Sequence, residues 1–264
     1  MKAVIIGRSG LGGVRMRGID VAARLGIPFA DSRTLPPGRH GTVVICKYWP
    51  DNIREIRARC DRMVLDPLDC WVQTYPLMRA QDFWRWCKEQ TGADLMVATT
   101  PSTEETMRAV GIETIYAPHH ADERIGRNWR DPAGPIVYSG GLRYLGAERN
   151  NIAAACKELG RDFIVRDDKD CWQALQGASV VLSTRFGVER TPLNIWCKPG
   201  VKLANAARAG IPVLATRDPA IYTLCQTEIV TGDWVEDIRA AINAEPCNAP
   251  YDIEDYCSAL KGIL

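Results

Sequence analysis

The sequence predicts an α/β protein built from two Rossmann-like domains that face each other across a cleft. Short apolar runs alternate with helical patterns along the chain, which indicates parallel sheets made of βα units. The alternation stops once, at the polar stretch 119–134, and then starts again. The length of 264 residues suits two domains of ordinary size. We therefore expect an N-terminal domain at 1–125, a C-terminal domain at 126–250 and a closing amphipathic helix at 251–264.

The first half has the pattern of one complete Rossmann-like unit. An apolar strand at 2–7 precedes a helix at 14–26, whose apolar spacing ends at Gly26. The following strands and helices alternate in the same way. Strands are expected at 41–49, 61–67, 93–100 and 112–118, and helices at 51–60, 81–92 and 101–111.

The second half repeats the pattern after the linker. Its expected strands lie at 134–141, 161–167, 179–185, 211–217 and 227–232, and its helices at 148–160, 169–178, 199–209 and 234–244. Because open α/β sheets bind ligands outside the carboxyl ends of their strands, we expect the active site in the cleft between the two domains.

Composition excludes several classes of protein. Hydrophobic residues make up 46% and charged residues 25%, which is typical of a chain that folds throughout. No apolar run is long enough for a signal peptide or a membrane span, so a cytoplasmic protein is expected, in the host cytoplasm if a bacteriophage encodes it. The ten cysteines contain no CxxC pair, which favours scattered core thiols over a metal site or a disulfide framework.

The segment KPGVKLANAARAGIPVLAT, residues 198–216, concentrates charge at the start of a helix. Gly210 fits the residue after the helix, and the expected helical spacing places Lys198, Lys202 and Asn205 within an arc of about 60°. Free N–H groups at a helix N-terminus and two lysines would favour a diphosphate. A solvated basic face is the alternative for any single Lys-x-x-x-Lys pair.

This segment resembles the nucleotide-sugar-binding segment of GT-B glycosyltransferases. The resemblance implies that Lys198 and Lys202 contact the donor diphosphate and that Asn205 replaces the usual acidic residue at the ribose. It extends over most of residues 90–216, where Arg143 and Arg149 in GGLRYLGAERN take the place of the phosphate-binding arginine. A UDP-sugar is therefore expected as co-substrate, with no tightly bound cofactor and no metal, in a monomeric enzyme.

The N-terminal loop GRSGLGGVRMR fits the family more loosely. Its glycines do not follow G-x-G-x-x-G, so a dinucleotide site is a poor fit. We expect Gly12 and Gly13 to approach the donor, and Arg15 and Arg17 to contact the acceptor.

The acceptor hydroxyl needs a base, for which the N-terminal domain offers carboxylates and histidines. Asp66 in DRMVLDPLDCW follows a strand and resembles the strand-end aspartate of phage DNA glucosyltransferases, with Asp69 as the second candidate. An Asp-Pro turn cap is the alternative. His119 and His120 at the domain exit are candidates for acceptor contacts.

Charge distribution bears on the acceptor. Residues 1–62 contain twelve Lys or Arg against five Asp or Glu, which favours an anionic acceptor such as double-stranded DNA. Glucosylation of 5-hydroxymethylcytosine in bacteriophage DNA, with UDP-glucose as donor, is the leading hypothesis. A saccharide or lipid-linked acceptor, a sugar-nucleotide epimerase and a donor-binding protein without catalysis are the alternatives.

Overall fold

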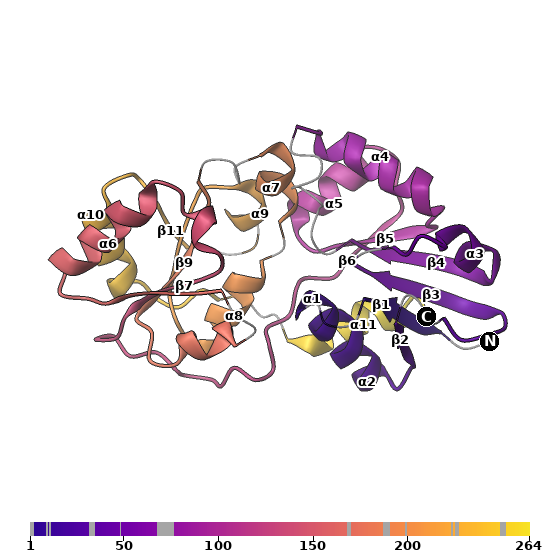
Figure 1. Ribbon diagram of the computed structural model, residues 1–264, viewed down its shortest axis with the longest axis horizontal. Coiled ribbons are helices and arrows are strands. Elements are labelled where there is room, and N and C mark those ends of the chain that lie inside the picture. Colours follow the sequence, from indigo (N-terminus) through magenta and orange to yellow (C-terminus); the bar gives the residue numbers. More distant parts are fainter. Residues whose placement is uncertain are drawn as a thin grey trace. The chain divides into compact units, whose positions relative to one another are not determined.

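The computed structural model describes the chain except residues 1–2, 9, 11, 32–34, 48, 68–76, 168–169, 187–190, 199, 223, 225–226 and 249–251. It divides into two compact units (Figure 1). Unit 1 consists of Met1–His119, Pro192–Pro199 and Asp252–Leu264. Unit 2 consists of His120–Thr191 and Gly200–Tyr251. The short segment 192–199 and the last helix thus return to unit 1 after the chain has entered unit 2.

Unit 1 is a parallel six-stranded sheet, called sheet A, in the order β2-β1-β3-β4-β5-β6. Its strands are β1 (Val4–Gly7), β2 (Phe29–Asp31), β3 (His40–Cys46), β4 (Cys60–Asp66), β5 (Leu95–Ala98) and β6 (Thr114–Tyr116). Its helices are α1 (Gly12–Val14), the π-helix η1 (Arg15–Asp20), α2 (Val21–Leu25), α3 (Ile53–Ala58), α4 (Ala80–Thr91), α5 (Pro101–Arg108), α7 (Pro192–Cys197) and α11 (Ile253–Lys261).

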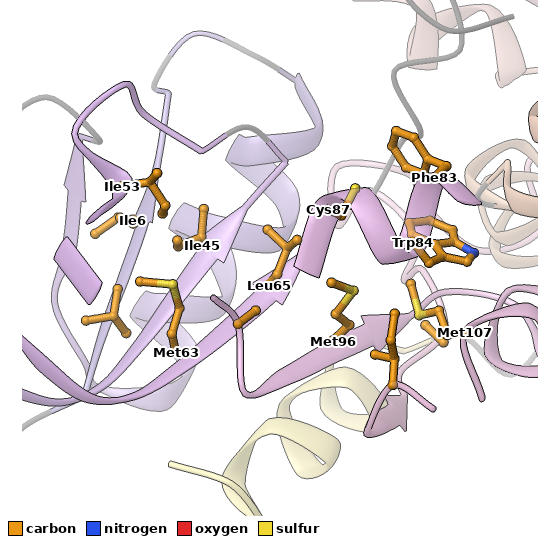
Figure 2. Packing of buried hydrophobic residues seen from close by; sticks show 14 of the residues in the cluster. Ile6, Ile45, Ile53, Met63, Leu65, Phe83, Trp84, Cys87, Met96 and Met107 are labelled. Atoms are coloured by element: carbon orange, nitrogen blue, oxygen red, sulfur yellow. The ribbon is translucent and has the colours of Figure 1, made fainter. Parts of the chain in front are cut away.

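Helices cover both faces of sheet A. Successive residues of each strand point to opposite faces, so each strand contributes to both hydrophobic cores. One face packs Ile6, Ile45 and Leu65 under α4, whose Phe83 and Trp84 are buried (Figure 2). The other face packs the alternate strand residues against α2 and α11. Arg24 of α2 and Glu254 of α11 form an ion pair of 3.1 Å, so α11 lies directly beside α2.

Unit 2 is a parallel five-stranded sheet, called sheet B, in the order β11-β10-β9-β7-β8. Its strands are β7 (Ile136–Ser139), β8 (Phe163–Arg166), β9 (Val180–Ser183), β10 (Val213–Ala215) and β11 (Glu228–Ile229). Its helices are the 3-10 turns η2 (Leu142–Tyr144) and η3 (Cys171–Leu175), and α6 (Glu148–Glu158), α8 (Val201–Ala209), α9 (Pro219–Tyr222) and α10 (Trp234–Asn243). Helix α8 covers one face, and α6 and α10 cover the other.

Several sequence-based expectations need local correction. The helix expected at 14–26 is interrupted by the π-helix η1, and the helix expected at 169–178 is only the short 3-10 turn η3. Strand β2 and helix α7 were not expected. The predicted helix ends at Gly26 and Gly210 are confirmed, because both residues adopt the left-handed conformation that glycine tolerates.

The cysteines behave as core residues in the described ranges. Eight cysteines lie there as thiols, and seven of them are buried. Burial raises the pKa of the Cys156 thiol to about 12, so this thiol stays protonated at neutral pH. Within those ranges, no group of three or more His, Cys, Asp or Glu side chains is arranged to hold a metal ion.

Candidate functional site

The carboxyl ends of the five parallel strands of sheet B lie at one edge, where open α/β sheets bind ligands. Three described segments that leave this edge consist of glycine or of polar residues. They are Gly140–Gly141 after β7, Thr184–Arg185 after β9 and Thr216–Asp218 after β10. We call this the sheet B edge.

Lys202 reaches the sheet B edge from the first turn of α8. Its Nζ lies 3.7 Å from the centroid of the Tyr138 ring. Tyr138 lies near the carboxyl end of strand β7, two residues before Gly140. Tyr138 itself is buried, with 1% of its surface exposed. A Cβ on Gly140 would lie 3.2 Å from the same Nζ, so the glycine leaves room for the ammonium group. The strand end, the glycine and the cation are therefore immediate neighbours.

Arg143 is the second predicted donor-binding cation at this edge. It lies in η2, directly after the two glycines, and its side chain is exposed. The guanidinium lies over the Tyr144 ring, 4.7 Å from the centroid, and Nη2 donates a hydrogen bond of 2.6 Å to the Tyr144 hydroxyl. Arg149, the other arginine predicted to bind the donor, is exposed in the first turn of α6.

A buried polar group lies at the ends of the neighbouring strands β9 and β10. Asp218 is fully buried, accepts a hydrogen bond of 3.0 Å from the Thr216 hydroxyl and lies 3.8 Å from Arg185. The Thr184 side chain is also fully buried. Sequence reasoning did not identify this group, although the motif S-T-R after an apolar run could have indicated it.

Lys198 does not lie on the helix that carries Lys202. Helix α8 begins at Val201, with Gly200 as its N-cap, whereas a start at about residue 199 was expected. The Lys198 N–H donates to the Asn194 carbonyl oxygen at 3.3 Å, so Lys198 closes α7 and belongs to unit 1. The shared face expected for Lys198, Lys202 and Asn205 is therefore wrong, because a helical arc requires all three residues on one helix.

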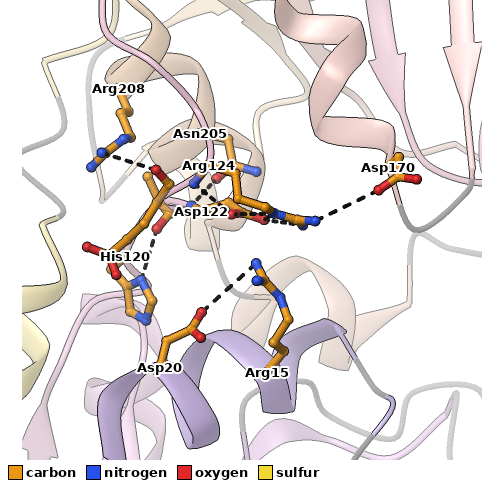
Figure 3. Close-up of polar contacts among 10 residues, drawn as sticks. Arg15, Asp20, His120, Asp122, Arg124, Asp170, Asn205 and Arg208 are labelled. Atoms are coloured by element: carbon orange, nitrogen blue, oxygen red, sulfur yellow. Dashed lines mark hydrogen bonds and ion pairs between the residues drawn. The ribbon is translucent and has the colours of Figure 1, made fainter. Parts of the chain in front are cut away.

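Asn205 binds the backbone of the chain that enters unit 2. Its Oδ1 accepts a hydrogen bond of 2.9 Å from the Asp122 N–H (Figure 3). One turn later Arg208 donates through Nε to the Ile125 carbonyl oxygen at 2.6 Å. Two side chains of α8 thus hold residues 120–130, which we call the entry segment and which lie within the irregular linker predicted at 119–134. The donor-ribose role expected for Asn205 has to compete with this hydrogen bond.

The entry segment is further ordered by Asp122 and Arg124. Arg124 donates to both carboxylate oxygens of Asp122 and lies over the Trp172 ring (Figure 3 shows the ion pair). The hydrogen bond with Asp122 raises the pKa of Arg124 above its ordinary value. His120, at the start of the segment, is buried, and its Nδ1 lies 2.9 Å from the Ala121 carbonyl oxygen.

The corresponding edge of sheet A contains the predicted base in a buried ion pair. Asp66 ends β4 and is fully buried, as is Arg17. Oδ2 of Asp66 accepts a hydrogen bond of 2.8 Å from Arg17 Nε and one of 2.6 Å from the Tyr256 hydroxyl. Two donors already use this oxygen, so the arrangement supports a structural role for Asp66 and gives no support for a base.

Protonation in this cluster follows from burial and charge. Burial alone would lower the pKa of Arg17, but the nearby Asp66 and Tyr256 raise it above its ordinary value. Burial raises the pKa of Tyr256 well above its ordinary value, so its hydroxyl keeps its proton and donates to Asp66. The expected acceptor contact by Arg17 does not hold in this structure, because no part of its side chain is exposed.

The other predicted residues of unit 1 are more scattered. Gly12 and Gly13 open α1, and a Cβ on Gly12 would meet nothing within 4 Å, so no steric demand explains that glycine. Arg15 is partly exposed and lies 3.9 Å from Asp20 (Figure 3). His119 is buried, with 4% of its surface exposed. Asp69 lies outside the described residues, as does Pro199.

The excess of positive charge in residues 1–62 is not a property of unit 1 as a whole. That unit contains 18 Lys or Arg against 16 Asp or Glu, a net charge of +2, and unit 2 has a net charge of −1. Acids from later in the chain pair with the early arginines, as in Arg57–Asp94 at 3.0 Å and Arg62–Glu113 at 3.6 Å. The argument for an anionic acceptor from the early sequence is weakened accordingly.

Comparisons with known proteins identify the fold. No protein-family model and no curated sequence matches the chain. Among solved structures, it is similar to AviGT4, a glycosyltransferase involved in avilamycin A biosynthesis, with 12% identity and a TM-score of 0.54 over 98% of this chain and 92% of that one. It is also similar to a UDP-forming α,α-trehalose-phosphate synthase from Burkholderia xenovorans in complex with glucose-6-phosphate. That likeness has 11% identity and a TM-score of 0.50 over 87% of this chain and 71% of the other.

At these identities, the likeness concerns the fold. Two parallel α/β domains, each with helices on both faces of its sheet, are present in the order that the sequence predicts. Among the described residues, no helix is both long and apolar enough to cross a bilayer. The predicted fold class, two Rossmann-like domains of the GT-B type, is confirmed.

Proposed function

We propose that the protein is a glycosyltransferase that binds a nucleotide-diphosphate sugar at the sheet B edge and transfers the sugar to an acceptor hydroxyl. The observation that carries the proposal is the position of Lys202 beside Gly140, at the carboxyl edge of a parallel sheet. The fold is shared with AviGT4, a glycosyltransferase, which supports the same reaction class.

The chemistry needs positive charge on the donor side. When the bond from the sugar to the diphosphate breaks, negative charge develops on the diphosphate, which is already a good leaving group and requires no proton. Lys202 and Arg143 supply two cations at the edge where the diphosphate would lie. The N–H groups of the first turn of α8 add partial positive charge.

UDP-glucose is the donor that we propose. The resemblance of residues 198–216 to a nucleotide-sugar-binding segment supports it, and the UDP-forming synthase with the same fold is consistent with it. Asn205 stands where an acidic residue would bind the ribose, which UDP, CDP and GDP share. A direct comparison of the binding of these three nucleotides therefore tests the preference for uracil.

The proposed acceptor is 5-hydroxymethylcytosine in DNA. Its support is the resemblance of GGLRYLGAERN and of the strand-end Asp66 to phage DNA glucosyltransferases, since the charge argument is weak for unit 1 as a whole. A saccharide or lipid-linked hydroxyl is the alternative acceptor. We assign no base, because Asp66 would have to leave Arg17 and Tyr256 before it could accept a proton.

Calorimetry with UDP tests the donor site first. Lys202→Ala should weaken UDP binding about tenfold to a hundredfold, the usual effect of losing a hydrogen bond to a charged group. Lys157→Ala is the matched control, since Lys157 is an exposed lysine in the last turn of α6 in the same unit. Equal UDP affinity of Lys202→Ala and the wild type would remove the donor-site assignment.

Product analysis then tests the reaction. The protein is incubated with UDP-glucose and DNA containing 5-hydroxymethylcytosine, and the DNA is digested to nucleosides for mass measurement. A hexose gain on the modified nucleoside supports the DNA acceptor, and its absence would exclude that acceptor. UDP-sugar alone is analysed in parallel, because conversion without an acceptor would indicate an epimerase instead.

A further inference from the structure

We propose that Tyr138 and Tyr144 are positioning residues, whose rings hold Lys202 and Arg143 at the sheet B edge. The inference rests on the proposed donor site and names two residues that the sequence did not single out. Each ring contacts one of the two cations, at 3.7 Å for Lys202 and 4.7 Å for Arg143. Both distances lie within the range in which an aromatic face attracts a cation.

The Tyr138 ring is a rigid support. The residue lies on β7 in the core that unit 2 builds from α6 and α10, and only 1% of its surface is exposed. A lysine side chain has four rotatable bonds and loses entropy when it is held in one place. A fixed ring in contact with Nζ reduces the number of conformations that Lys202 occupies before the donor arrives, which lowers the entropy lost on binding.

The Tyr144 ring acts on Arg143 in two ways. The guanidinium lies over the ring and donates to the hydroxyl of the same residue at 2.6 Å. Tyr144 is in turn fastened to the loop after β9, because its carbonyl oxygen accepts the Phe186 N–H at 3.4 Å. Phe186 packs edge to face on the buried Trp234, with ring centroids 5.7 Å apart. Arg143 is exposed, but the residue beside it is anchored to the core.

The two glycines between the tyrosines are part of the same arrangement. A Cβ on Gly140 would lie 3.2 Å from Lys202 Nζ and 3.2 Å from the Tyr138 ring. A Cβ on Gly141 would lie 3.0 Å from Asp167 Oδ2 and 3.3 Å from the Tyr144 ring. A side chain at Gly140 would crowd both Lys202 and its ring, and one at Gly141 would crowd the Tyr144 ring, so the two glycines let this loop pass close to both rings.

Calorimetry with UDP tests the inference with leucine and phenylalanine variants at both positions. Tyr138→Leu and Tyr144→Leu should each weaken UDP binding about threefold to tenfold, the loss expected for one partly desolvated cation–ring contact. Tyr138→Phe keeps the ring and should recover most of the affinity. Tyr144→Phe should recover part of it, because the hydrogen bond from Arg143 is still lost. Tyr116→Leu in unit 1 is the matched control.

Salt dependence separates positioning from charge loss. UDP affinity should decrease as the salt concentration rises from about 50 to about 200 mM, because salt screens the attraction between Lys202 and the diphosphate. Lys202→Ala removes this attraction, so its affinity should depend less on salt. The leucine variants should lower the affinity and leave its salt dependence as in the wild type. A purely structural defect would instead lower the melting temperature in proportion to the loss of binding.

The outcomes distinguish this inference from the proposed function. Wild-type UDP affinity in both leucine variants, together with weak binding by Lys202→Ala, would overturn the positioning role and leave the donor site intact. Wild-type affinity in Lys202→Ala would overturn both. If Tyr138→Leu does not fold, Tyr144→Leu and Tyr144→Phe decide the matter, because Tyr144 is only partly buried.

Discussion

The carboxyl edges of sheets A and B both contain cations, but the cations differ in burial. At the sheet A edge, Arg17 is fully buried between the carboxylate of Asp66 and the ring of Tyr256. At the sheet B edge, Lys202 and Arg143 also lie against tyrosine rings, but Lys202 is only half-buried and Arg143 is exposed. A basic residue near a strand end is therefore not by itself a binding residue, because a fully buried cation cannot meet a ligand.

The buried pair at the sheet A edge gives the largest expected effect. Asp66→Asn would leave Arg17 without its charged partner in the core, which costs about 3–5 kcal/mol of unfolding free energy. Asp61→Asn is the matched control, because its ion pair with Arg39 is exposed and is worth about 1 kcal/mol or less. Denaturant unfolding measures both. Normal stability with lost transferase activity in Asp66→Asn would restore its assignment as the base.

The second largest effect is expected from a substitution of Gly140 at the sheet B edge. Gly140 has φ of 156° and Gly146 has φ of 55°, and both lie in the same unit. Alanine at either position should cost about 1 kcal/mol through backbone strain. Only Gly140→Ala brings a Cβ against Lys202, whereas the space around Gly146 is open, so only Gly140→Ala should also weaken UDP binding. Parallel melting and calorimetry compare the two variants, and equal UDP affinities would contradict the close contact.

A smaller effect is expected where α8 holds the entry segment. Asn205→Ala removes the acceptor of the Asp122 N–H and should cost about 1 kcal/mol locally. The amide hydrogen of Asp122 should then exchange about fivefold faster, measured by hydrogen exchange. Asn151→Ala, on the exposed face of α6, serves as the control. Unchanged exchange at Asp122 would show that Asn205 does not hold the segment.

The smallest effect is expected at Glu148 of unit 2, whose carboxylate accepts hydrogen bonds from two uncharged side chains. The indole N–H of Trp234 and the amide of Asn151 lower the pKa of Glu148 below its ordinary value. A depressed folded-state pKa stabilises the fold above the unfolded value of about 4.5 and loses this contribution as pH falls through the folded value. Trp234→Phe should raise the pKa of Glu148 in an NMR titration. Trp172→Phe should leave it unchanged.

Much of the fold was predictable because it depends on local pattern. The alternating apolar runs identified most strands, and Gly26 and Gly210 ended their helices as expected. Helix α7 was missed because six residues are too short for a helical period to stand out. It is stable through tertiary contacts, since Leu193 and Cys197 are buried in unit 1 and the Ser102 hydroxyl donates to the Trp196 carbonyl oxygen.

The candidate site was predictable only in part. Lys202 and Arg143 could be selected because their types and spacing resemble a known donor segment. Tyr138 and Tyr144 could not, since an aromatic residue at a strand end is usually part of the core. The sequence predicts a catalytic Asp66 from its position after a strand and an acceptor-binding Arg17 from its glycine-rich loop. It gives no sign that the two residues meet, because they lie 49 positions apart.

The sequence by itself determined two parallel α/β domains, the ends of several helices and a basic segment before a G-I-P-V strand. Hydrophobic periodicity and the freedom of glycine are local properties, so they can be read from neighbouring residues. Only the tertiary structure decided which side chains surround each cation. Arg17 meets Asp66 and Tyr256, and Lys202 meets Tyr138, across distances along the chain that no local pattern records.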